Sequence, residues 1–229
     1  SINKQKIIYP DMQKYFKTMM FSAVVALGSC GGNATQEEDF EFTNERFADI
    51  QMLRYRVDGF EQLSLQQKTF IYYLQEAALW GRDILFDQNG RYNLEIRRMM
   101  EKLYQEYDGD RECADFKAFE VYLKRLWFSN GIHHHYGSEK FSPEFSKEWF
   151  VAQTSCSDEV AEVIFNPDVM PKRVNQAQGE DLVLTSASNY YQGVTQAEAE
   201  AFYARVKAEG DQQRPVMHGM NSTLVKAED

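Results

Sequence analysis

Residues 93–127, NLEIRRMMEKLYQEYDGDRECADFKAFEVYLKRLW, decide the fold class. Both halves of this stretch place apolar side chains three and four residues apart, a spacing that puts them on one face of an α-helix. The polar turn 108–110 separates the halves, and Asn93 can cap the first of them. We therefore predict two helices with facing apolar sides. Those sides are Ile96, Met99, Met100, Leu103 and Tyr107 in the first helix, and Phe116, Phe119, Leu123, Leu126 and Trp127 in the second.

Further helices and a few short strands are predicted around this pair. The capping boxes Ser64-x-x-Gln67 and Thr195-x-x-Glu198 each open a helix, the first running to the turn at 87–90. A short helix follows Pro143, and strands are expected within 40–57, at 181–185 (DLVLT) and at 221–226 (NSTLVK). The apolar side chains of the first helix are Phe70, Ile71, Leu74, Ala77, Ala78 and Leu85. Because the links between helices are short, we expect packed neighbours in a mainly helical α+β fold.

Composition narrows the classes of partner. The chain has 229 residues, 14% of them aromatic, and a formal net charge of −10. An acidic chain is a poor match for nucleic acid, which normally needs a basic face, and for direct binding to anionic lipid. Three cysteines do not make a disulfide framework. Cys113 and Cys156 could pair outside the cytoplasm, but Cys113 lies in a helical pattern that favours a buried thiol.

The segment 12–29 followed by Cys30 is similar to the export signal and lipobox of bacterial lipoproteins. Two lysines precede a short apolar run, and Leu27-Gly28-Ser29 precedes the cysteine. The run has about ten residues, half of what a spanning helix needs, which disfavours a transmembrane anchor. We expect Cys30 to be lipidated, 30–40 to be a flexible tether, and 1–11 to be a disordered extension or untranslated sequence upstream of Met12. The protein is then exported and tethered by its lipid alone to the bacterial cell envelope, in the periplasm or at the cell surface.

The histidine triplet 133–135 is the main candidate for chemistry. Adjacent residues cannot all face one metal from regular structure, although His133 and His135 can share one face of an extended segment. Two imidazoles need a third ligand for zinc, and no His-Glu-x-x-His or Cys-x-x-Cys spacing supplies one. The chain also lacks a Gly-x-Ser-x-Gly and a Walker-type loop. From the residues alone we predict no catalytic residue and no metal ligand, and the histidines either stabilise their loop or contact a substrate.

Several segments, in order, resemble the dipeptidyl peptidase III family of two-lobed zinc exopeptidases. The first is 127–143, WFSNGIHHHYGSEKFSP, and the second is 190–206, YYQGVTQAEAEAFYARV, followed by Asn-Ser-Thr-Leu-Val-Lys at 221–226. The linking segment MPKRVNQAQGEDLVLTSAS, 170–188, is similar to the bacterial branch of the family. The resemblance runs from about Phe47 to the end of the sequence.

The resemblance implies an enzyme that removes dipeptides from the amino terminus of short peptides. Its zinc is held by His-Glu-x-x-Gly-His and a later Glu, and the motif Glu activates water. That motif is absent from these 229 residues. We therefore expect 41–229 to be a partial domain, incomplete at its carboxyl end and inactive alone, whose partner is the missing catalytic lobe. The alternative is a stand-alone lipoprotein that binds peptides without cutting them.

The resemblance also suggests which residues line the peptide cleft. We expect Asn130, His133, His135 and Tyr136 to contact the peptide, with loop stabilisation as the alternative, and Lys140 to be a structural partner of the loop. A partial domain should expose apolar surface that the missing lobe would cover. The aromatic side chains expected to be uncovered are Trp149, Tyr190 and Tyr191.

Overall fold

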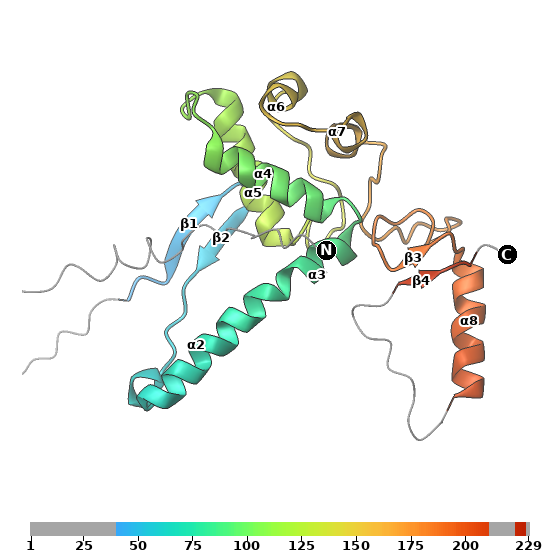
Figure 1. Ribbon diagram of the computed structural model, residues 1–229, viewed down its shortest axis with the longest axis horizontal. Helices are drawn as coiled ribbons and strands as arrows, with labels where there is room; N and C mark the ends of the chain where they lie inside the picture. The colour runs from blue at the N-terminus through green and yellow to red at the C-terminus, as the bar shows by residue number, and fades with distance from the viewer. Residues whose placement is uncertain (1–39, 211–222, 228–229) are drawn as a thin grey trace, which may run out of the picture. The chain divides into compact units, whose positions relative to one another are not determined.

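The computed structural model describes residues 40–210 and 223–227. About half of this part is helical, and its strands are few and short, so the predicted mainly helical α+β class is confirmed (Figure 1). Outside the described residues lie the predicted export signal, Cys30 and nearly all of the tether. The first two residues of the strand predicted at 221–226 also lie outside them. The helices are α2 (Leu65–Trp80), α3 (Arg82–Asn89), α4 (Asn93–Glu106), α5 (Ala114–Ser129), α6 (Lys147–Gln153), α7 (Asp158–Phe165) and α8 (Gln196–Glu209), with a 3-10 turn, η1, at Phe60–Gln62.

The core forms where α4 and α5 pack together, as the spacing predicts. Phe119 of α5 is fully buried, and its ring centroid lies 5.7 Å from those of Phe145 and Trp149 and 6.3 Å from that of Phe150. Fully burying an apolar side chain of this size stabilises a fold by about 1.5–3 kcal/mol. Trp127 lies at the edge of the predicted face, where its indole N–H donates to Glu101 at 2.9 Å. The buried members of the two predicted faces are Ile96, Met100, Leu103, Phe116, Phe119, Leu123 and Leu126.

The helix predicted from Ser64 to the turn at 87–90 is divided into two. Gly81 separates α2 from α3, and only α3 reaches the core, through Phe86. No residue of α2 is buried. The expectation that this helix packs along its length against its neighbours is therefore wrong, because its apolar side chains have no covering layer among the described residues.

Two small sheets complete the structure. β1 (Thr43–Phe47) and β2 (Ile50–Leu53) form an antiparallel hairpin whose turn places Ala48 at φ 49°. β3 (Tyr191–Gln192) and β4 (Leu224–Val225) pair in parallel. β4 lies within the strand predicted at 221–226.

The strand predicted at 181–185 is wrong. The segment is a turn, because the carboxylate of Asp181 accepts hydrogen bonds from the amides of Val183 and Leu184 at 2.9 Å each and from that of Gln196. A short acidic side chain that captures nearby amides competes with a strand ladder. These contacts also hold the pKa of Asp181 below its usual value.

Local side chains fix the helix starts. Both predicted capping boxes are present, at Ser64 and at Thr195. Asn93 is not a cap: Tyr92 takes the N-cap position, and Asn93 begins α4 with its side chain buried. Cys113 caps α5, its sulfur accepting the amide of Phe116 at 3.4 Å. Within the described residues Cys113 and Cys156 are half-buried free thiols.

Candidate functional site

The candidate loop begins where α5 ends, and tight packing sets its direction. Asn130 caps α5 in the left-handed conformation at φ 53°, and its carbonyl accepts the side-chain amide of Asn89 at 3.0 Å. Gly131 follows at φ 150°, against the side chain of Asn93. A Cβ at Gly131 would lie 2.4 Å from Nδ2 of Asn93, so only glycine fits. Asn93 Oδ1 then accepts the amide of Ile132 at 3.3 Å. Asn130, which the family resemblance suggests as a peptide contact, reverses the chain direction at the end of α5.

Backbone hydrogen bonds close the loop into a hairpin-like turn. The amide of His134 donates to the carbonyl of Glu139 at 2.7 Å, and the amide of Phe141 donates to that of Ile132 at 2.9 Å. His133 and Lys140 face each other in an antiparallel bridge. The backbone of residues 133–140 is therefore held in place by these hydrogen bonds.

His133 points inward. It is 2% exposed, and its Nε2 lies 2.8 Å from the carbonyl of Met170, so Nε2 carries the proton in this contact. Burial lowers the pKa of His133 to about 4. Its Nδ1 is buried and has no hydrogen-bond partner among the described residues. Of the two roles expected for His133, these contacts support stabilisation of the loop, because the buried ring bonds the loop to the segment around Met170.

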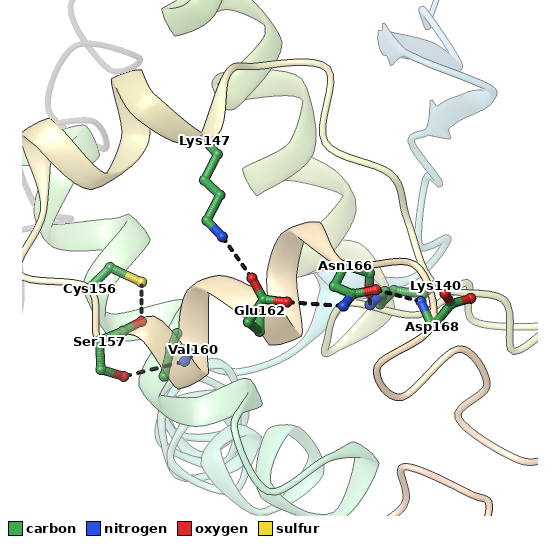
Figure 2. Close-up of polar contacts among 8 residues, drawn as sticks. All are labelled: Lys140, Lys147, Cys156, Ser157, Val160, Glu162, Asn166 and Asp168. Atoms are coloured by element: carbon green, nitrogen blue, oxygen red, sulfur yellow. Dashed lines mark hydrogen bonds and ion pairs between the residues drawn. The ribbon is translucent and has the colours of Figure 1, made fainter.

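Lys140 is the structural partner that the sequence predicts. Its ammonium donates to the carbonyls of Val163 at 3.1 Å and Val169 at 2.6 Å, and also to that of Asn166 (Figure 2). These carbonyls belong to the end of α7 and the turn after it, where a helix leaves acceptors unpaired. Burial lowers the pKa of Lys140, opposed by the charges of Asp168 and Glu162. One side chain thus fastens the closing strand of the loop to α7.

His134 connects the loop to the β1–β2 hairpin. Its Nδ1 accepts the amides of Tyr136 and Gly137 at 3.2 and 3.0 Å, so the ring proton resides on Nε2. That Nε2 lies 3.9 Å from Oδ2 of Asp49. Arg125 of α5 donates to the other oxygen of Asp49 at 2.6 Å. A backbone hydrogen bond and then this contact with Arg125 hold the pKa of Asp49 below its usual value.

His134, His135 and Tyr136 stack into a continuous surface, called here the ring stack. The centroids of the two imidazoles are 4.5 Å apart, and that of His135 lies 4.3 Å from Tyr136 and 4.9 Å from Phe128. Tyr136 is 86% exposed. Burial, followed by the neighbouring His134, lowers the pKa of His135. Arg173 holds the backbone in place by donating to the carbonyl of His135 at 2.9 Å.

The ring stack offers flat surfaces and imidazole nitrogens but no reactive pair. Among the described residues, no three His, Cys, Asp or Glu side chains are grouped so that they could hold a metal ion. His133 and His135 do not act as a pair, since one is bonded to a carbonyl and the other is stacked between rings. The described residues do not fit the zinc that the resemblance implies. The arrangement is suited to holding a ligand by stacking and hydrogen bonding.

Sequence reasoning missed three residues that shape this site. Asp49 and Arg125 are 76 residues apart in sequence, and Arg173 is 38 residues from His135. Nothing in the local pattern links them. His134 was visible as the middle of the triplet, but its role depends on the hairpin that brings Asp49 beside it.

No protein-family profile matches this chain, and no curated protein matches it. Of the helices that the structure describes, none has the length and apolar character to cross a bilayer.

Proposed function

We propose that this chain is the amino-terminal part of a zinc dipeptidyl peptidase and that the ring stack contacts the peptide substrate. The ring stack supports this proposal most directly. It forms within 127–143, the segment with the first family resemblance, and it places Tyr136 almost fully in solvent while the loop beneath is tied down. A rigid loop that displays exposed rings is typical of a ligand-binding surface.

The residues of the loop divide into two roles in this proposal. His135 and Tyr136 offer contact with a peptide, with His134 and Asp49 at the edge of the ring stack. Asn130 and His133 hold the loop in shape. Zinc, bound by a His-Glu-x-x-Gly-His motif elsewhere in the parent protein, would supply the activated water. The chain alone is then inactive.

The encoding gene tests the first half of this proposal. An open reading frame that continues past codon 229 to His-Glu-x-x-Gly-His supports it, and a genuine stop codon favours the non-catalytic peptide-binding lipoprotein. Hydrolysis of a dipeptidyl-naphthylamide by the 229-residue chain with added zinc would contradict the proposal directly.

Kinetics of the longer protein test the second half. Tyr136→Ala should raise KM with little change in kcat, because a contact made equally in the ground and transition states affects binding alone. Tyr55→Ala is the control, since Tyr55 is 79% exposed but lies outside the loop. Unchanged KM in Tyr136→Ala and in His135→Ala would remove the ring stack from the substrate site.

We also propose that the protein is exported and lipidated on Cys30. The support is the order of basic residues, apolar run and small residues before that cysteine. Intact mass of the protein from a bacterial membrane fraction should show acylation and a new amino terminus at Cys30. Cys30→Ser should remain unacylated, whereas an unmodified wild-type protein would contradict the proposal.

A further inference from the structure

The candidate loop forms one edge of a small unit of three paired segments. His133 faces Lys140 in one antiparallel bridge. Glu139 faces Lys172 in a second antiparallel bridge. Residues 139–140 are therefore the middle segment of the unit, with the start of the loop on one side and the segment that contains Lys172 on the other.

The imidazole of His133 joins the two outer segments. Its Nε2 donates to the carbonyl of Met170, which lies just before Lys172 in the far segment, at 2.8 Å. The side chain thus crosses one face of the middle segment to reach the opposite edge, and it is 2% exposed. Since the paired segments enclose the ring, it meets water only when they part.

Only the neutral form of this ring suits its position. Its Nδ1 is buried, and within the part of the chain that the structure describes it has no hydrogen-bond partner that would accept a second proton. The charged groups of the described residues that act on the ring are both cations, Lys140 in the middle segment and Arg173 in the far one. The carboxylates of Asp168 and Glu162 act on Lys140. Because a buried imidazolium beside two cations is costly, protonation favours a ring that has moved into water.

The backbone of the unit is strained where the segments are joined. Two non-glycine residues lie in the left-handed region, Met170 at φ 52° and Ser138 at φ 66°. Both of their carbonyls accept hydrogen bonds across the unit, from His133 and from the amide of Arg173 at 2.8 Å. Such conformations persist only where surrounding contacts impose them. Parting of the segments therefore relieves strain, which lowers the cost of opening.

We propose that His133 is an acid-operated latch, which holds the loop against the Met170 segment while the ring is neutral and releases the loop when the ring is protonated. The proton comes from solvent and binds Nδ1, so that both ring nitrogens then donate to water. Opening also separates Arg173 from the carbonyl of His135, which it holds at 2.9 Å in the closed unit. The ring stack then loses this support, and only the consequence for peptide binding rests on the proposed function.

Hydrogen exchange of backbone amides in the 229-residue chain, followed by NMR from pH 7 to pH 4, tests the latch. The reporters are the amides of Lys140 and Arg173, which donate across the unit to the carbonyls of Pro171 and Ser138. A ring that titrates at about 4 when closed and about 6.5 when open makes the opening constant rise by about a hundredfold over this range. The protection factors of both reporters should fall by that amount. The amides of α5 should stay better protected by about tenfold or more at every pH, because the opening is local.

Two variants isolate the ring. His133→Gln keeps an N–H for the carbonyl of Met170 but does not titrate, so the fall in reporter protection should shrink to within about threefold. His135→Gln is the matched control, because it removes the neighbouring imidazole, which is stacked between rings and does not join the segments. This control should keep the full fall. Circular dichroism at pH 7 checks that both variants retain their helix content.

Four results would overturn the inference. In the wild-type chain, reporter protection could fall by less than about tenfold, or the reporters and the α5 amides could be equally protected because the whole chain unfolds together. The other two are a full fall in His133→Gln and the loss of the fall in His135→Gln. The first two need no variant, so they decide the matter even if a substituted chain does not fold. Exchange is measured without peptide or zinc, so the latch and the proposed function fail separately.

Discussion

Replacing Lys140 by methionine should destabilise the protein far more than replacing the exposed Lys147. The ammonium of Lys140 donates to three carbonyls at the end of α7 and in the turn after it, those of Val163, Asn166 and Val169. Methionine keeps much of the length and volume of lysine but donates no hydrogen bond. Lys140→Met therefore removes the polar contacts while leaving the packing largely intact.

The size of the effect follows from the number of bonds and from the solvent around them. A hydrogen bond from a charged donor stabilises a fold by about 1.5–3 kcal/mol, so three would give at most about 9 kcal/mol. Burial of the ammonium opposes this, as its lowered pKa shows, and carbonyls near the surface regain water in the variant. We expect Lys140→Met to lower the free energy of unfolding by about 3 kcal/mol, which moves the urea midpoint down by about 1 M or more.

Lys147→Met is the matched control. Lys147 of α6 is paired with Glu162 of α7 at 2.7 Å, but both groups are exposed to solvent (Figure 2). Exposed pairs contribute little, so the urea midpoint of this variant should stay close to that of the wild type. Equal midpoints for Lys140→Met and Lys147→Met would refute the reasoning that Lys140 fastens the loop to α7.

Three further predictions concern the core and the loop. Gly131→Ala should lower the free energy of unfolding by about 2–4 kcal/mol, through strain at φ 150° and the clash with Asn93, while Gly179→Ala, with φ 90° but no atom within 4 Å, should cost less; urea denaturation compares them. His133 has a pKa of about 4 when folded and about 6.5 when unfolded, so the unfolded chain takes up the proton first as the pH falls. The free energy of unfolding should drop by up to about 3 kcal/mol from pH 6.5 to pH 4, and a His133→Gln variant should lack this part of the drop. Phe119→Ala should cost about 3–5 kcal/mol in a thermal melt, and a loss below about 1 kcal/mol would contradict its place at the centre of the core.

Helical periodicity predicted the core because it depends on short spacings. The apolar faces of α4 and α5 recur every three to four residues, and the helix start at Ser64 is determined by residues within one turn. The strand predicted at 181–185 shows the limit of this reasoning. Its apolar residues fit a strand, but the single side chain of Asp181 captures the local amides and makes a turn. The hydrophobic pattern alone does not show whether a backbone amide will bond to a neighbouring strand or to a nearby side chain.

The candidate site depends on contacts over longer distances in sequence. The sequence shows the triplet 133–135, and side-chain alternation in an extended segment predicts that neighbouring histidines point in opposite directions. Which histidine points inward is decided by the carbonyl of Met170, which lies 37 residues further along the chain. The aromatic residues expected to be uncovered show the same limit. Tyr190 is exposed as expected, but Trp149 packs against the core and Tyr191 is half-buried. The larger uncovered surface lies on α2.

The contrast between α4 and α2 identifies what a hydrophobic pattern leaves open. Both helices have apolar residues at helical spacing, yet Ile96 and Met100 of α4 are fully buried while Phe70 and Leu74 of α2 are more than half exposed. The pattern states which side chains share a face, and the covering layer must come from other parts of the structure. Local spacing therefore predicts the helix and its apolar side, whereas burial depends on contacts with elements that are distant in sequence.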